Sequence, residues 1–155
     1  MIEVLNISKG FEHKQVLTDI STVFEKGKIN LIIGGSGSGK TVLQKCVVGL
    51  FTPDAGKVLY DGKDFYAMTR EEKKEIRQEI GMVFQGGALF DSQTVEENVM
   101  FPLTMFTKQT TQEKLERANF CLSRVNLENV NKLFPSELSG GMKKRAALAR
   151  AVAWV

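Results

Sequence analysis

The opening of the chain alternates short apolar and polar positions in the manner of β-strands. Residues 2–8 alternate apolar and polar side chains, and residues 20–25 are rich in β-branched ones, which predicts two strands. The apolar run at residues 29–33 predicts a third strand. Residues 57–60, which precede the turn pair Asp61-Gly62, predict a fourth. The first part of the chain is therefore expected to be rich in β-structure.

Helical spacing replaces this pattern further along the chain. Three threonine and glutamate pairs have the spacing of a helix capping box: Thr69 with Glu72, Thr94 with Glu97, and Thr110 with Glu113. They predict helices over residues 69–79 and over most of 92–126, with an apolar strand at 81–85 between them. The alanine-rich run at residues 145–153 predicts a last helix, for which Ser139 is the expected N-cap.

Composition narrows the class of protein. The 155 residues are 43% hydrophobic, which suffices for one domain with a core. The 21 basic and 18 acidic side chains give a net charge of +3, too balanced for nucleic acid or an anionic membrane to be the main partner. Cys46 and Cys121 fall in helical patterns and are expected to be buried, reduced thiols. No apolar run approaches membrane-spanning length and the first residues predict a strand, so a cytoplasmic location is expected.

A glycine-rich loop carries the clearest chemistry. Eight residues directly after the apolar run 29–33 have the spacing G-x-x-x-x-G-K-[ST] of a phosphate-binding loop: Gly34, Gly35, Ser36, Gly37, Ser38, Gly39, Lys40 and Thr41. Glycine permits positive φ, so consecutive N–H groups can point at a polyphosphate, and the following helix N-terminus adds partial positive charge. Lys40 is expected on the β and γ phosphates and the Thr41 hydroxyl on Mg²⁺. The alternative is a flexible turn, which the strand and helical spacing on either side disfavour.

A second glycine pair lies at another predicted helix start. In Leu138-Ser139-Gly140-Gly141-Met142, two glycines follow the expected N-cap and leave backbone N–H groups uncovered. The alternative is a loop that merely ends in a serine cap. Since one phosphate-binding loop serves one triphosphate, the second helix end is expected to serve the nucleotide of another copy. A two-fold dimer with two shared sites would follow.

The order of these motifs resembles a known family. The loop at 34–41, then Val83-Phe84-Gln85, then a helical stretch and Leu138-Ser139-Gly140-Gly141 resemble the ATP-binding subunit of ABC transporters over the whole chain. The resemblance implies an α/β P-loop NTPase fold with an N-terminal antiparallel β part and a helical subdomain. Residues 1–85 and 138–155 would form the core, and residues 86–137 the Q-loop and helical subdomain.

The resemblance also implies roles for single residues. ATP is the implied nucleotide, and Lys40 and Gln85 are the implied catalytic residues. Gln85 would reach the attacking water and, with Thr41, Mg²⁺, although it could also be only a polar strand end. Phe11 would stack on adenine, although an early aromatic equally serves packing. The glycine turn of a second copy would close on the γ phosphate in a head-to-tail dimer: Ser139, Gly140 and Gly141.

A narrower resemblance concerns the cargo. Residues 84–91, 98–103 and 135–142 resemble the MCE-associated lipid transport ATPases, in which methionine is usual at the place of Met142. This implies phospholipid transport, with a transmembrane permease and an MCE lipid-binding protein as partners. The subunit would then lie on the inner face of the cell membrane, held there by the permease. Composition and spacing say nothing about lipid.

The family's acidic strand is not found in the sequence. Hydrolysis in the family uses a strand ending in aspartate and glutamate and a later histidine, whereas Asp61 and Asp91 have no adjacent glutamate and His13 lies too early. The chain is therefore expected to be truncated before that strand, to hydrolyse ATP poorly, and to be marginally stable or to associate.

Three other functions share some of these sequence features with a transporter subunit. A soluble ABC ATPase of translation or DNA repair would normally carry two cassettes or a long coiled-coil insert. A nucleotide-binding regulatory module without hydrolysis would lack the acidic pair in its full gene. A nucleic-acid binder could use the basic residues 143–145, but consecutive residues fan around a helix rather than forming one face. The transporter subunit is favoured.

Overall fold

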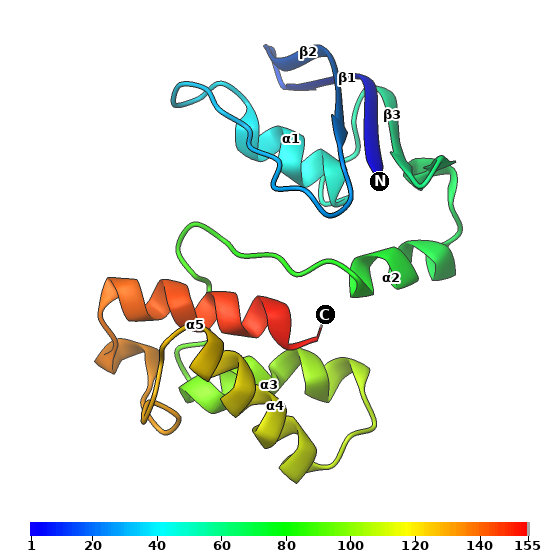
Figure 1. Cartoon of the computed structure of the whole chain (residues 1–155). Helices are drawn as coiled ribbons and strands as arrows, with labels where there is room; N and C mark the ends of the chain where they lie inside the picture. The colour runs from blue at the N-terminus through cyan, green and yellow to red at the C-terminus, as the bar shows by residue number, and fades with distance from the viewer. Residues whose placement is uncertain (155) are drawn as a thin grey trace. The chain divides into compact units, whose positions relative to one another are not determined.

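The computed structural model describes residues 1–154, and the chain divides into two compact units, Met1–Arg77 and Gln78–Val155. The first unit is built on an antiparallel sheet with the strand order β2-β1-β3-β4 (Figure 1). Its strands are β1 (Ile2–Phe11), β2 (Lys14–Phe24), β3 (Ala55–Tyr60) and β4 (Lys63–Asp64). Its helices are α1 (Lys40–Val47), the short η1 (Phe65–Ala67) and α2 (Arg70–Gln78).

A bulge in β1 sets which side chains face the core of this unit. Val4 pairs with Thr22 and Ile7 with Ile20, so β1 uses one more residue than β2 over this stretch. Asn6, at the bulge, has a positive φ of 51°. Because of the extra residue, Val4 and Ile7 lie three positions apart and are both fully buried.

The second unit is helical. It contains α3 (Val95–Phe106), α4 (Thr111–Arg124), η2 (Pro135–Glu137) and α5 (Gly140–Ala153). Each long helix contributes one apolar stripe to a shared core, and α5 contributes mainly alanines, which allow close approach: Val95, Val99, Leu103, Ala118, Cys121, Leu122, Ala146, Ala149 and Ala153. The three helices are drawn together in green, yellow and red in Figure 1.

Several predictions from the pattern are confirmed. The capping boxes at Thr94 and Thr110 form and begin α3 and α4, and Ser139 is the N-cap of α5. Thr69 and Glu72 exchange the expected hydrogen bonds at the start of α2. Both cysteines are buried and free.

Two predicted strands are wrong. Residues 29–33 and 81–85 have no strand conformation and pair with no other strand among residues 1–154. A strand is stabilised by hydrogen bonds to a neighbour, so an apolar sequence alone does not produce one. Leu31 and Ile33 are 80% and 85% exposed. The helical spacing after the glycine-rich loop corresponds to α1, which ends at Val47.

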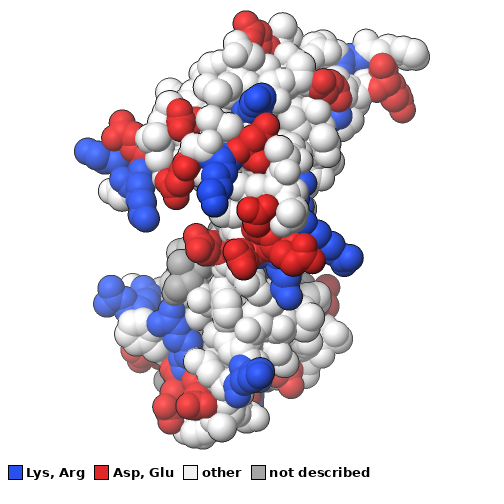
Figure 2. All heavy atoms as spheres, turned by 90° about the vertical axis from the view of Figure 1, so that its right-hand side faces the viewer, with Lys and Arg blue, Asp and Glu red and all other residues white. Residues whose placement is uncertain are grey.

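The surface carries both signs of charge. Figure 2 shows lysine and arginine side chains interspersed with aspartate and glutamate on the visible face of each unit, as the balanced composition predicts. Within the described residues, none of the helices has the length and apolar character needed to cross a membrane.

Candidate functional site

The glycine-rich loop ends on a left-handed residue at the start of α1. Gly39 is the N-cap, with φ 92°, and Gly37 has φ 77°. A Cβ atom on Gly39 would lie 2.8 Å from Leu17 Cδ2 and 3.1 Å from the Val16 carbonyl oxygen. Both the backbone conformation and the close approach of β2 therefore require glycine here.

The N-terminus of α1 is open to an anion. No side chain caps it, and its first turn contains no acidic residue. The first helical hydrogen bond runs from Leu43 N–H to the Gly39 carbonyl oxygen at 2.9 Å. The preceding amides, from Lys40 to Val42, have no acceptor within residues 1–154. Unpaired N–H groups and the helix dipole together favour a bound phosphate.

Lys40 lies against the loop that precedes it. Its ammonium group donates to the carbonyl oxygens of Gly34 and Gly35, both at 2.7 Å. Ser38 N–H closes a turn onto the Gly35 carbonyl oxygen at 3.3 Å. Thr41 is exposed on the same first helical turn, so its hydroxyl is accessible. A cationic amine, a hydroxyl and open amides fit a polyphosphate with Mg²⁺.

Two tyrosines hold the other end of α1. The Tyr60 hydroxyl donates to the Val47 carbonyl oxygen at 2.9 Å, and the Tyr66 hydroxyl lies 2.5 Å from the Cys46 carbonyl oxygen. Burial raises the pKa of Tyr60 to about 12 and also raises the pKa of Tyr66, so both hydroxyls stay protonated at neutral pH. They fix the helix that presents Lys40 and Thr41. No motif in the sequence identifies this pair.

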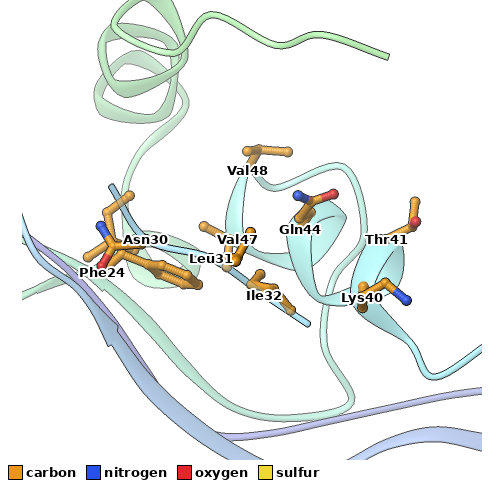
Figure 3. Close-up of a pocket in the computed structure, with 10 residues that line it drawn as sticks. Phe24, Asn30, Leu31, Ile32, Lys40, Thr41, Gln44, Val47 and Val48 are labelled. Atoms are coloured by element: carbon orange, nitrogen blue, oxygen red, sulfur yellow. The ribbon is translucent and has the colours of Figure 1, made fainter. Parts of the chain in front are cut away.

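A cavity of about 370 Å³ lies beside α1. Figure 3 shows residues that line it, among them Phe24, Leu31, Lys40, Thr41, Gln44 and Val47, and the lining comes from α1, β1, β2 and the segment before the glycine-rich loop. Six of the ten lining residues are apolar, and none of the loop glycines lines the cavity. Of the residues predicted for the phosphate site, the cavity is lined only by Lys40 and Thr41.

Phe11 ends β1. Its ring packs edge-on against Phe51, with ring centroids 5.3 Å apart, and 40% of the residue is exposed. The Lys9 ammonium lies 5.4 Å from the ring centroid. The ring thus has a packing contact and an exposed part, and adenine stacking stays a prediction.

Gln85 lies at the tip of a tight turn in the second unit. Gly87 N–H donates to the Phe84 carbonyl oxygen at 2.8 Å, which places Gln85 and Gly86 at the two central positions. Gln85 is exposed. The turn is followed by two residues with positive φ, Gly87 at 79° and Ala88 at 47°.

The predicted second anion site lies at the start of α5. The Ser139 side chain accepts a hydrogen bond from Met142 N–H at 3.3 Å, so part of this helix end is already satisfied. Gly140 and Gly141 are exposed, and a Cβ atom on either would have nothing within 4 Å. The backbone of this turn can therefore be approached closely from outside.

Sequence reasoning missed two residues that hold the turn of Gln85. The Arg150 guanidinium on α5 donates to the carbonyl oxygens of Ala88 and Gly87, at 2.8 and 2.9 Å. Asn98 on α3 is fully buried, and its amide accepts from Phe90 N–H at 2.7 Å and donates to the Phe90 carbonyl oxygen at 3.1 Å. Arg150 lies in none of the quoted motifs, and Asn98 lies in the segment 98–103, for which the resemblance implied no role at this turn.

Known proteins resemble the chain over nearly its whole length. Residues 17–154 match the protein family described as ABC transporter. The probable ribonucleotide transport ATP-binding protein mkl of Mycobacterium bovis is 38% identical over 97% of this chain and 42% of its own length. The intermembrane phospholipid transport system ATP-binding protein MlaF of Escherichia coli is 39% identical over 99% of this chain and 57% of its own length. The chain thus spans about half the length of these relatives.

A solved structure agrees with the fold. The dimeric post-hydrolysis state of the ATP-binding cassette MJ0796, bound to ADP and Pi, superposes with a TM-score of 0.90. It is 31% identical in sequence, and the match covers 99% of this chain and 69% of the other. The predicted α/β fold of an ATP-binding cassette, with an antiparallel β part and a helical part, is confirmed.

Proposed function

This chain belongs to the ABC transporter family, and from that premise we propose that it is the nucleotide-binding part of a subunit that hydrolyses ATP to drive transport. The open N-terminus of α1 carries the proposal. A helix end with no side-chain cap, no acidic residue and a lysine folded over the preceding loop is arranged for a polyphosphate.

Each loop group has a task in this proposal. The amides of residues 34–41 bind the phosphates, and Lys40 exchanges the carbonyl oxygens of Gly34 and Gly35 for phosphate oxygens. The Thr41 hydroxyl and the Gln85 side chain would hold Mg²⁺, which would supply positive charge next to the phosphates. Phe11 stacks on adenine through the exposed part of its ring.

The reaction is hydrolysis of the bond to the γ phosphate. Gln85 orients a water molecule whose oxygen bonds to the γ phosphorus as the bridging oxygen leaves with ADP. Catalysis of this kind depends on position and charge, not on a covalent intermediate. The exposure of Gln85 at the tip of its turn suits contact with water and nucleotide.

A second copy of the protein completes the site. Ser139, Gly140 and Gly141 of one copy close on the γ phosphate held by the other, in a head-to-tail two-fold arrangement. The open space around both glycines supports this role, because another backbone could approach them. Residues 1–85 and 138–155 serve as the core and residues 86–137 as the Q-loop and helical subdomain.

The second unit also offers a surface for the membrane partner. Phe90 and Phe101 pair with ring centroids 4.7 Å apart, and both are exposed, as is Met105 one turn further along α3. Exposed aromatic residues grouped in this way favour a protein partner. A transmembrane permease that docks here would hold the subunit at the inner face of the membrane.

Phospholipid is the proposed cargo, and an MCE lipid-binding protein the further partner. The name of MlaF supports phospholipid, whereas the name of mkl refers to ribonucleotide. With the permease reconstituted in vesicles, ATP-dependent movement of labelled phospholipid is the expected result. Movement of ribonucleotide without lipid would contradict the proposed cargo and leave the ATPase proposal intact.

Replacement of the loop lysine tests the nucleotide site. Lys40→Ala removes the ammonium group beside the loop and should weaken ATP binding roughly 100-fold in titration calorimetry. Lys74→Ala, which removes an exposed lysine of α2, is the matched control and should leave the affinity unchanged. Equal affinity of both variants and the parent protein would overturn the proposed site.

A further inference from the structure

The segment that carries Gln85 is fastened to α5 on both sides of its turn. A Cβ atom on Gly81 would lie 2.2 Å from the Ala151 carbonyl oxygen, so the backbone passes directly over the C-terminal part of α5. On the other side, a Cβ atom on Gly87 would lie 3.6 Å from Ala147 Cβ. The turn between these two contacts is exposed.

Arg150 makes the polar part of this attachment. Its two terminal nitrogens bind two consecutive carbonyl oxygens, those of Ala88 and Gly87, and its guanidinium carbon lies 5.7 Å from the centre of the Phe90 ring. No carboxylate forms an ion pair with it within residues 1–154. Burial lowers the pKa of Arg150, as expected for a cation that has partly left water.

The backbone that Arg150 holds is not one the chain adopts readily. Ala88 has a positive φ of 47°, a conformation that the Cβ atom of an L-residue disfavours. A planar guanidinium can bind two neighbouring carbonyl oxygens at once, which an ammonium cannot do with the same geometry. The arginine thus stabilises a local conformation that the sequence around Ala88 does not specify.

The next residues are fixed from the other helix. Asn98 of α3 binds both the N–H and the carbonyl oxygen of Phe90. Residues 87–90 are therefore bound by α5 through Arg150 and by α3 through Asn98. Gln85 and Gly86 are left as the exposed tip on this fixed base.

We propose that Arg150 is a positioning residue for ATP hydrolysis: by holding the carbonyl oxygens of Gly87 and Ala88 on α5, it fixes where the Gln85 side chain stands. It also makes the turn of Gln85 and the helix that begins after Ser139 move as one body. The inference rests on the proposed function, because it assumes that Gln85 acts on the nucleotide. Precise placement of such a group governs the rate of a reaction more than the affinity for its substrate.

Arg145 provides the matched control. It lies on the same helix and donates to the carbonyl oxygens of Val125 and Asn126, at 3.3 and 2.7 Å, but these residues follow α4 and not Gln85. Arg145→Met and Arg150→Met both remove an arginine of α5 that binds two consecutive carbonyl oxygens. Arg150→Lys keeps the charge, and it serves as the test variant if Arg150→Met does not fold.

The first measurement is amide hydrogen exchange in the full-length protein. The Gly87 N–H closes the turn of Gln85, so its exchange should become roughly tenfold faster in Arg150→Met and change less in Arg150→Lys. Arg145→Met should leave this amide unchanged. An unchanged rate in both Arg150 variants, or the same acceleration in Arg145→Met, would overturn the proposal.

The second measurement links Arg150 to Gln85. At saturating ATP, Arg150→Met should lower kcat roughly tenfold with little change in the Kd for ATP, and it should have no further effect when Gln85→Ala is already present. A full additional loss in the Gln85→Ala background would overturn the proposal. If Gln85→Ala alone leaves hydrolysis unchanged, the role of Gln85 is overturned instead, and the exchange measurement still decides whether Arg150 fixes the turn.

Discussion

The N-termini of α1 and α3 differ in what happens to the backbone N–H groups that have no partner within the helix. At α3, the Thr94 hydroxyl accepts from Glu97 N–H at 3.4 Å and the Glu97 carboxylate accepts from Thr94 N–H at 2.7 Å. At α1, Gly39 offers no side chain and the first turn has no acidic residue. The N–H groups at the start of α3 are satisfied by its own residues, whereas those at the start of α1 are left open.

The two helix ends differ in how much their backbone N–H groups contribute to the stability of the fold. A capping box contributes stability because it pairs N–H groups that are otherwise left to water. Leaving α1 uncapped gives up that contribution, and the tyrosines at its other end help to keep the helix in place. The start of α5 is intermediate, with a serine cap followed by two glycines.

The largest effect is expected from a methyl group at the start of α1. Gly39→Ala places a Cβ atom against Leu17 and the Val16 carbonyl oxygen in a left-handed conformation, which should cost about 2 kcal/mol or more in the free energy of unfolding. ATP binding should be lost with the loop geometry. Urea unfolding and ATP titration measure the two effects.

Gly35→Ala is the control for this change in the same loop. A Cβ atom there would have nothing within 4 Å, so the free energy of unfolding should change by less than about 0.5 kcal/mol. If the two alanine variants unfolded at the same urea concentration, the steric account of Gly39 would be wrong.

A smaller effect is expected from removing a cap of the second unit. Thr94→Ala deletes the hydroxyl that accepts from Glu97 N–H and should lower the free energy of unfolding by about 1 kcal/mol without changing ATP affinity. Thr104→Ala, at an exposed position within α3, should be neutral or slightly stabilising, because alanine is the better helix former. Loss of ATP affinity in Thr94→Ala would break the proposed division between capped and binding helix ends.

The helix starts could be predicted from the sequence because their signals are local. A threonine and a glutamate three residues apart contain everything a capping box needs, and the boxes at Thr94 and Thr110 form as predicted. The signal for the glycine-rich loop is local too, since it consists of the spacing of eight neighbouring residues. Whether residues 29–33 and 81–85 form strands does not depend on local sequence alone, because a strand also needs a neighbouring strand to pair with.

The supports of the site could not be predicted for the same reason. Arg150 binds the carbonyl oxygen of Ala88, which lies 62 residues earlier, and Tyr66 reaches the carbonyl oxygen of Cys46, 20 residues earlier. Every residue has a backbone carbonyl group, so no sequence motif can identify which one a distant side chain binds. The sequence thus proposes candidate ligand-binding groups, whereas the groups that hold them in place are found only in the structure.

The smallest effect is the part of the pH dependence of stability that arises at the capping boxes of α3 and α4. Hydrogen bonds from the Thr94 backbone N–H, and then from its hydroxyl, lower the pKa of Glu97 below its ordinary value of 4.5. The Thr110 N–H and hydroxyl lower the pKa of Glu113 in the same way. A carboxylate whose pKa is lower in the folded state contributes stability above its unfolded pKa, and this contribution is lost as the pH falls through the folded value.

Urea unfolding at a series of pH values from about 6 to about 3 should therefore show that the free energy of unfolding declines below about pH 4.5. Glu97→Gln should reduce this decline, because glutamine does not titrate. The N-terminus of α1 has no such carboxylate, so an equal reduction on replacing Glu75, a glutamate of α2 outside any capping box, with glutamine would show that general charge and not capping sets the acid sensitivity.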